Sequence, residues 1–444
     1  MRMWTPAALV AALLIPGGAA FAQAPAPRVP LSLGDAVTRA AERTAGVELA
    51  GLRVSEAQAR VGQARSALLP NLSAAMGTSS RTFNLEAMGI SLPTPPGTPA
   101  PDPLVGPVSN VDARLRLSQP LFDAAGYLRT RAAKVAVGGS EAERSVAAEA
   151  AASRAAMAYL KAERAQAVLA AREADVKLAA ELLDLAETQL KAGVSTAIDV
   201  TRARTQKVAA EGQQLVAKNA AEQAQIDLAR SLGMDPATRF ALSDSLGAGA
   251  PAGVGAEQAV AEALSKRPEL RQVAAMSDAA KANRRAIQAE RLPRLDVVAD
   301  YGASGLNAND AIATRQVGIQ VSVPLVDGLR RESRLAEQDA VHREMELRAS
   351  DLRQQVSAEV QAALLDLENG RQQQAVAAER LRLAEEELSQ ARERFSNGVA
   401  GNIELINAQQ SLNRARDAEI DARFATAAAQ ANLARAMGAA QEIR

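Results

Sequence analysis

Most of the chain follows a helical pattern, in which small and apolar residues recur at steps of three and four. Val47 and Ala50 begin one such seam, which continues to Leu68. Ser32 and Asp35 fit a capping box at the start of that segment. The pattern predicts helices over about residues 32–69, 123–191, 196–232, 256–291, 327–396 and 402–437.

At four places the period changes to two, which is typical of β-strands. Val317, Ile319 and Val321, for example, alternate with polar residues such as Gln316 and Gln320. We expect strands at about 71–82, 111–121, 294–303 and 315–325, each with one apolar and one polar face. Residues 82–110 are rich in proline and predict a long loop between the first two strands.

The same order of elements occurs twice. Leu69-Pro70 returns as Leu292-Pro293, and Gly193-Val194 returns as Gly398-Val399. A period of about 200 residues is too long for a solenoid repeat, so the sequence indicates a tandem duplication. We place the first structural repeat at 23–249 and the second at 250–444, joined by a glycine-rich linker at 246–255.

In each repeat, the first and last helices together match the single long helix in length. Two short helices stacked end to end beside one long helix would form a hairpin of even height. At 1.5 Å per residue, the long helix would extend for about 100 Å. The sequence therefore predicts an elongated helical body.

Composition narrows the function. The 444 residues carry 51 basic and 51 acidic side chains, and no basic run predicts nucleic-acid binding. Residues 1–22 resemble a secretory signal peptide with an apolar centre from Ala7 to Ile15. A membrane anchor is the alternative, but this run is far shorter than the ~20 residues that span a bilayer. The chain has no cysteine, which excludes disulfides and a lipid-modified cysteine.

The four alternating strands fit a transmembrane β-barrel, with apolar residues toward lipid and polar residues toward water. Four strands cannot close a barrel, and an open sheet edge is not stable in lipid, so the chain must associate. The alternative is a soluble antiparallel sheet with one solvated face. Phe122, Tyr127 and Tyr301 lie near strand ends and would form a sparse aromatic girdle.

This arrangement resembles the TolC-like outer-membrane efflux family over essentially the whole mature chain. The segments that carry the resemblance are Ala67-Leu68-Leu69-Pro70-Asn71-Leu72, Gln119-Pro120-Leu121-Phe122, Lys191-Ala192-Gly193-Val194-Ser195 and Phe395-Ser396-Asn397-Gly398-Val399. The resemblance implies a mainly α-helical protein with a membrane β-barrel. Long hairpins would form a periplasmic α-barrel, and four strands per protomer would contribute to a 12-stranded barrel in a homotrimer.

The resemblance also implies a function. The protein would be a passive outer-membrane duct for efflux or type I secretion, docked with a periplasmic adaptor and an inner-membrane pump. A periplasmic adaptor is one alternative, but it would have a single hairpin flanked by β-rich halves. A structural coiled coil is another, but it would not need four alternating strands.

The resemblance assigns roles to the two helix-hairpin turns. The predicted adaptor-docking tips are Gly193, Val194 and Ser195, with Gly398, Val399 and Ala400 in the second repeat. The predicted periplasmic entrance constriction comprises Asp199, Arg202, Glu404 and Asn407. We expect three copies of Glu404 to favour cations, with Arg202 as their partner in the closed state.

No catalytic, cofactor or metal site is predicted. The single histidine, His342, lies in a charged helical segment where we expect a solvated surface position. One histidine without a matching nucleophile does not support hydrolytic chemistry.

Overall fold

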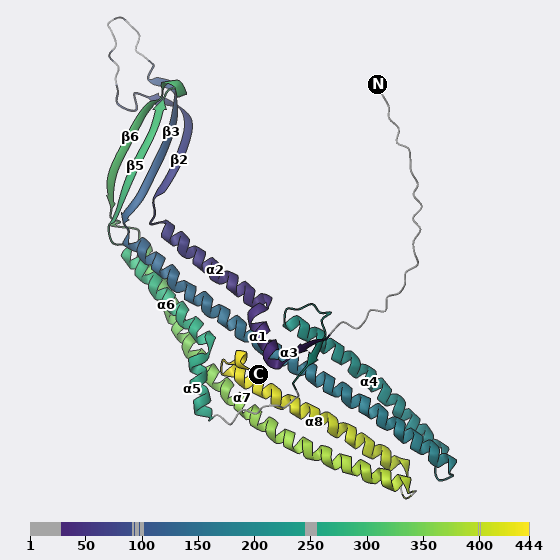
Figure 1. The fold of residues 1–444 in the computed structure, drawn as a ribbon. Coiled ribbons are helices and arrows are strands. Elements are labelled where there is room, and N and C mark those ends of the chain that lie inside the picture. Colours follow the sequence, from purple (N-terminus) through teal and green to yellow (C-terminus); the bar gives the residue numbers. More distant parts are fainter. Residues whose placement is uncertain are drawn as a thin grey trace, which may run out of the picture.

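The computed structural model describes residues 28–90, 93, 97, 102–244, 255–397, 399 and 401–443. The molecule is long, with a four-stranded sheet at one end and two helix-hairpin turns at the other (Figure 1). The predicted signal peptide, and the predicted linker apart from Gly255, lie outside the described residues.

Two long helices form the body, and shorter helices lie along each of them. The first repeat contains α1 (Leu33–Arg43), α2 (Ala45–Ser66), α3 (Ala124–Lys191) and α4 (Ala197–Ser231). The second contains α5 (Ala256–Lys266), α6 (Pro268–Ala289), α7 (Arg330–Ser396) and α8 (Asn402–Ala436). Figure 1 shows α2 and α4 end to end along α3, as their lengths predict, and α6 and α8 follow α7 in the same way. Single turns of 3₁₀ helix, η1 (Ala308–Asp310) and η2 (Ala440–Glu442), complete the helical elements.

The helices predicted at 32–69 and 256–291 are each broken in two, so both predictions were wrong in this respect. Thr44 and Arg267 adopt extended backbone at the two breaks. At the second break, Pro268 disfavours helical geometry in the residue before it. A left-handed glycine packs against each break. A Cβ on Gly233 would lie 3.3 Å from the carbonyl oxygen of Arg43, and one on Gly438 would lie 3.1 Å from the Cα of Arg267.

The long helices begin differently in the two repeats. Asp123 caps α3 by accepting a hydrogen bond from the amide of Gly126 at 2.7 Å. In contrast, α7 begins at Arg330 rather than at the predicted residue 327. Gly328 and Leu329 both have a φ of 65°, and this left-handed backbone delays the helix.

The sheet consists of β2 (Asn71–Asn84), β3 (Leu104–Phe122), β5 (Arg294–Gly305) and β6 (Ile312–Ser322). All neighbours are antiparallel, in the order β2-β3-β5-β6. The predicted loop at 82–110 is shorter than expected because β3 begins at Leu104. The pairing register of β2 and β3 shifts between Arg81 and Phe83 of β2. Pro107 of β3 lies in this interruption of the hydrogen-bond ladder, where a proline is tolerated.

A second, two-stranded sheet was not predicted. The strands β1 (Val29–Leu31) and β4 (Phe240–Leu242) pair in parallel near the middle of the molecule. The fully buried Tyr159 of α3 joins this sheet by donating its hydroxyl to the Leu31 carbonyl at 3.2 Å. Burial raises the pKa of Tyr159 to about 12, so its phenol stays neutral and remains a donor.

Small side chains dominate the buried contacts between helices. In the largest cluster around Tyr159, many of the buried residues are alanine. Gly370 lies within the uninterrupted helix α7. A Cβ on Gly370 would lie 3.3 Å from the Cα of Thr426 in α8, so this glycine permits close approach of the two helices.

His342 is less exposed than the expected solvated surface position. Its Nδ1 lies 2.9 Å from the hydroxyl of Ser277, so the ring bridges α6 and α7 and is half-buried.

Candidate functional site

One face of the four-stranded sheet is apolar in every strand, and we call it the outward face. Cross-strand partners share a face, and the register aligns Leu72, Leu117, Ala299 and Val317 in one row. This face is open, since Leu72 is 68% and Val317 is 77% exposed. A continuous exposed apolar surface of this kind needs a covering phase or partner.

The opposite, inward face is polar, and several of its charged side chains form ion pairs with one another. Arg114 donates from Nε to Asp112 at 2.8 Å and from its terminal nitrogen to Asp300 at 3.0 Å. At the helix-proximal end, Arg294 donates to Asp296 at 3.0 Å. Polar side chains that satisfy one another along the inward face suit a wet lumen rather than a packed core.

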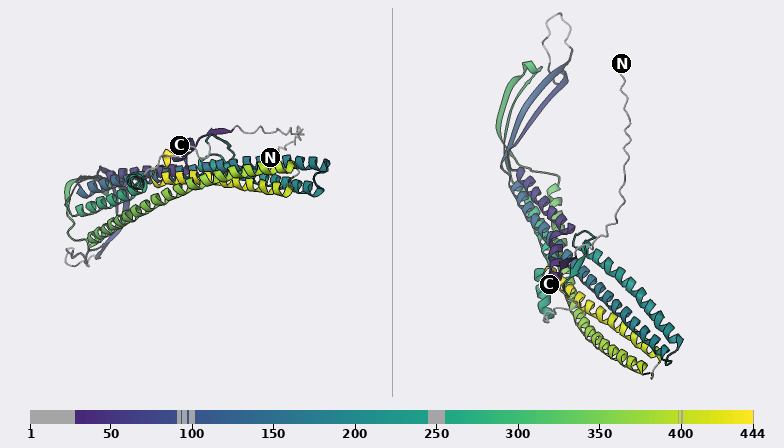
Figure 2. Two further views of the ribbon diagram at one scale, coloured as in Figure 1. Left: turned by 90° about the horizontal axis from the view of Figure 1, so that it is seen from below. Right: turned by 45° about the vertical axis from the view of Figure 1, so that its right-hand side comes forward.

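The two edge strands of the sheet, β2 and β6, each have one unpaired edge. Among the described residues, β2 pairs only with β3, and β6 pairs only with β5. Figure 2 shows the four strands as one curved layer standing clear of the helices. The sheet is therefore an open segment whose two edges remain available for pairing.

At the other end of the molecule, the α3–α4 turn forms the first tip. Gly193 has a φ of +76°, and the amide of Val194 donates to the carbonyl of Gln189 at 3.0 Å, which closes the end of α3. A Cβ on Gly193 would meet nothing within 4 Å, and Val194 is exposed. Ser195 donates its hydroxyl to Asp199 at 3.2 Å. The tip therefore presents open backbone and one exposed apolar side chain.

The second tip repeats part of this geometry. The amide of Val399 donates to the carbonyl of Arg394 at 2.9 Å, and the Val399 side chain is exposed. The predicted tip residues Gly398 and Ala400 lie outside the described residues.

The four predicted entrance residues lie in the first two turns of α4 and α8, and the starts of these helices adjoin each other. Asn402 of α8 donates its side-chain amide to the carbonyl of Asp199 at 2.8 Å. Arg202 lies one turn further along α4, while Glu404 and Asn407 are exposed on α8. The fold thus brings these residues together at the tip end of the molecule.

Within one protomer, these charged residues pair locally. Within the chain, Glu404 is bound by Arg394 at 2.9 Å, whereas Arg202 lies 3.8 Å from Asp199. Arg394 is in the last turn of α7, and the hairpin turn folds it back onto the first turn of α8. Glu404 thus has a partner within its own protomer, and its pairing with Arg202 in the closed state of a trimer stays a prediction.

Asp199 has a further role in the first turn of α4. The Thr196 hydroxyl donates to its carboxylate at 2.6 Å and the Thr196 amide donates at 3.2 Å. The hydroxyl bond, more than the nearby Arg202 charge, holds the pKa of Asp199 below its ordinary value. Asp199 is therefore ionised at neutral pH and fixed by its own helix.

Sequence reasoning missed three residues at this end: Gln189, Arg394 and Asn402. The buried Gln189 donates to the carbonyl of Phe395 at 2.7 Å, so it joins the two hairpins as Asn402 does. A polar residue within an apolar helical seam was the available signal for Gln189. The contacts of Arg394 and Asn402 depend on how the hairpins pack, which periodicity does not encode.

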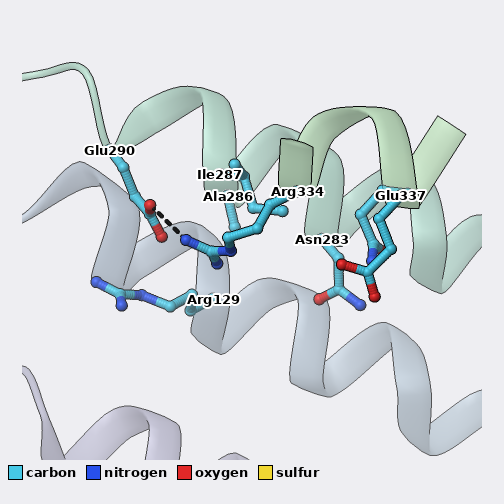
Figure 3. A pocket seen from close by; sticks show the side chains of 8 residues that line it. Arg129, Asn283, Ala286, Ile287, Glu290, Arg334 and Glu337 are labelled. Carbon is cyan, nitrogen blue, oxygen red and sulfur yellow. Dashed lines mark hydrogen bonds and ion pairs between the residues drawn. The ribbon is translucent and has the colours of Figure 1, made fainter. Parts of the chain in front are cut away.

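A cavity of about 230 Å³ lies between α3, α6 and α7 on the sheet side of the molecule (Figure 3). Arg334 reaches Glu290 across it at 2.7 Å, while Arg129 and Glu337 add one charge of each sign. Because these charges balance, the cavity does not favour a ligand of either sign. The described residues contain no cluster of three metal-binding side chains. No described helix combines the length and apolarity needed to cross a membrane.

Comparisons with known proteins agree with this architecture. The family model described as outer membrane efflux protein matches residues 36–234 and 259–439. The alkaline protease secretion protein AprF of Pseudomonas aeruginosa is 28% identical over 326 residues. That alignment covers 70% of this chain and 66% of AprF, so it spans slightly less than two thirds of the relative.

Solved structures share the fold. The outer membrane protein VceC of Vibrio cholerae matches with a TM-score of 0.72 at 18% identity, covering 91% of this chain and 96% of VceC. The MtrE outer membrane channel of Neisseria gonorrhoeae, solved in its open state, matches with a TM-score of 0.71 at 19% identity. That match covers 92% of this chain and 89% of MtrE.

Proposed function

Because the chain belongs to the outer membrane efflux protein family, we propose that it forms a passive exit duct for efflux or secretion across the periplasm and outer membrane. The observation that carries this proposal is the four-stranded sheet, which is apolar and exposed on one face and polar and ion-paired on the other. Such a sheet suits a boundary between lipid and water.

We propose that three copies assemble. The unpaired edges of β2 and β6 would join between protomers, so that three sheets close into a 12-stranded barrel with no free edge. The helices of the three copies would then surround a tunnel below the barrel. Neither alternative, a periplasmic adaptor or a structural coiled coil, accounts for an amphipathic sheet with two open edges.

The same proposal implies two partner proteins, a periplasmic adaptor and an inner-membrane pump. The exposed Val194, beside the open backbone of Gly193, and the exposed Val399 offer small apolar side chains for the helices of a periplasmic adaptor. An inner-membrane pump would supply the substrate to the duct. AprF, as a secretion protein, supports export of polypeptides as one possible use of such a duct.

The first test is the mass of the purified protein in detergent, combined with conductance in planar bilayers. We expect a mass three times that of the mature chain and stable open or gated channels. A monomer that does not conduct would overturn the proposal.

Adaptor docking is tested by Val194→Asp together with Val399→Asp. A charge at each of these positions should abolish export in cells, because an apolar helix contact would have to bury it. Detergent mass and bilayer conductance serve as controls and should stay unchanged. Normal export by the double variant would place docking elsewhere.

A further inference from the structure

The outward face of the sheet contains a charge that the barrel itself does not explain. Arg315 lies on β6 directly opposite Tyr301 of β5. The same cross-strand row contains Leu115 of β3 and Ala74 of β2. Among the outward positions of the four described strands, Arg315 is the single charged side chain. A charge on a lipid-facing surface is costly unless it lies at the headgroup level.

Among the described residues of its own chain, Arg315 has no partner that would neutralise it. It is exposed, and within the described part of the chain it makes no ion pair or side-chain hydrogen bond. This contrasts with Arg114 on the inward face, which is held by both Asp112 and Asp300. The guanidinium of Arg315 therefore keeps its full capacity to bind an anion.

The position of Arg315 along the strand places it near the distal end of the apolar band, with one further apolar row, Met76-Ala113-Ala303-Ala313, beyond it. Val323, just after β6, is an exposed apolar residue on the helix side, and it lies eight positions from Arg315. At about 3.4 Å per residue this is roughly 27 Å along the strand. A tilt of about 40° reduces the height to roughly 20 Å, close to the apolar band of about 25 Å in such barrels.

Both side chains of the pair suit this boundary. Arginine can extend its charged end away from the apolar layer toward headgroups. Tyr301, which is exposed, has the amphipathic ring that is enriched at membrane interfaces. A planar guanidinium binds phosphate through two parallel hydrogen bonds.

We propose that Arg315 and Tyr301 form a binding site for the phosphate headgroup of a lipid in the outer leaflet of the outer membrane. This inference rests on the proposed function, which places the helices in the periplasm and the distal end of the sheet at the cell surface. The trimer would carry three such sites, one on each β6 strand.

The test is native mass spectrometry of the detergent-solubilised trimer with a phosphorylated glycolipid, compared with the same glycolipid after phosphate removal. We expect the wild-type trimer to retain the phosphorylated lipid preferentially. Arg315→Gln should weaken that retention by about fivefold per site, the typical effect of one basic residue at an anionic surface. Arg315→Lys should weaken it less, because the charge remains.

Arg116→Gln is the matched control. Arg116 lies on the inward face and also lacks an ion pair among the described residues, so its loss should leave lipid retention unchanged. Equal retention by wild type and Arg315→Gln would overturn the proposal, as would equal retention of the dephosphorylated lipid. Displacement of the lipid by millimolar inorganic phosphate would also overturn it, because the site would then bind free phosphate.

Bilayer conductance of the same preparation separates this proposal from the proposed function. A conducting trimer without phosphate preference would contradict the lipid site alone. A preparation that is monomeric and does not conduct would contradict both.

Discussion

The charged residues at the tip end are fixed largely by contacts within their own hairpins. Glu404 is held by Arg394, and Asp199 is held by Thr196 and Ser195. In a trimer, a ring of Glu404 would therefore be accompanied by a ring of Arg394. If these residues form the entrance, its ion selectivity would depend on both of them rather than on the carboxylates alone.

Opposite shifts in ion selectivity are expected for the two members of this pair. Arg394→Gln would uncover Glu404 and shift the reversal potential toward cations, whereas Glu404→Gln would leave Arg394 unpaired and shift it toward anions. The measurement is the reversal potential of single channels in a salt gradient. Shifts of the same sign, or none in either variant, would show that the constriction lies elsewhere.

A second residue-scale prediction concerns the pH dependence of the α4 cap. The pKa of Asp199 is lowered in the folded protein, so its contribution is present above about pH 4 and is lost as the pH falls through the folded pKa. We expect amide protection in the first turn of α4 to decrease in that range.

Asp199→Asn provides the control for this measurement, because its amide oxygen can still accept a hydrogen bond but does not titrate. Hydrogen exchange, corrected for the intrinsic effect of pH, should show the acid-induced loss in the wild type and a weaker dependence in the variant. Identical profiles would assign the loss to another group.

Among the elements, the long helices and the four strands were predictable because their periods differ and persist over many residues. The break at Arg267 was also encoded locally by Pro268, although the sequence interpretation overlooked it. The break at Thr44 and the β1–β4 pairing were not predictable, because each depends on tertiary contacts of very few residues. The tips were predictable from glycine, but the link from Asn402 to Asp199 was not, since it joins different hairpins.

The close approach of α7 and α8 gives a prediction at this scale. Gly370→Ala should lower the free energy of unfolding by about 1–3 kcal/mol, because the added methyl group would crowd the backbone of Thr426. Gly62→Ala in α2 is the control, since a Cβ there meets nothing within 4 Å. That change should be neutral or stabilise by up to about 1 kcal/mol. Thermal unfolding of both variants is the measurement, and equal behaviour would contradict the proposed packing role.

For the whole molecule, the two ends have different requirements. The sheet needs lipid outside, water inside and a partner at each edge, while the hairpin tips need an external partner at exposed valines. The tandem duplication meets both requirements, because each repeat supplies two strands of the four-stranded sheet and one helical hairpin. The alternation of apolar and polar residues predicted the two faces of the sheet, and the register confirms that these faces align across all four strands.

The natural absence of cysteine allows the central claim to be tested directly on β6. Single cysteines would be introduced at successive positions from Gln316 to Val321, and each variant would be treated in membranes with a charged thiol reagent. We expect reaction at the inward positions Gln316, Gly318 and Gln320, and protection at the outward positions Val317, Ile319 and Val321. Equal reactivity at both sets of positions would contradict a sheet that separates lipid from a water-filled duct.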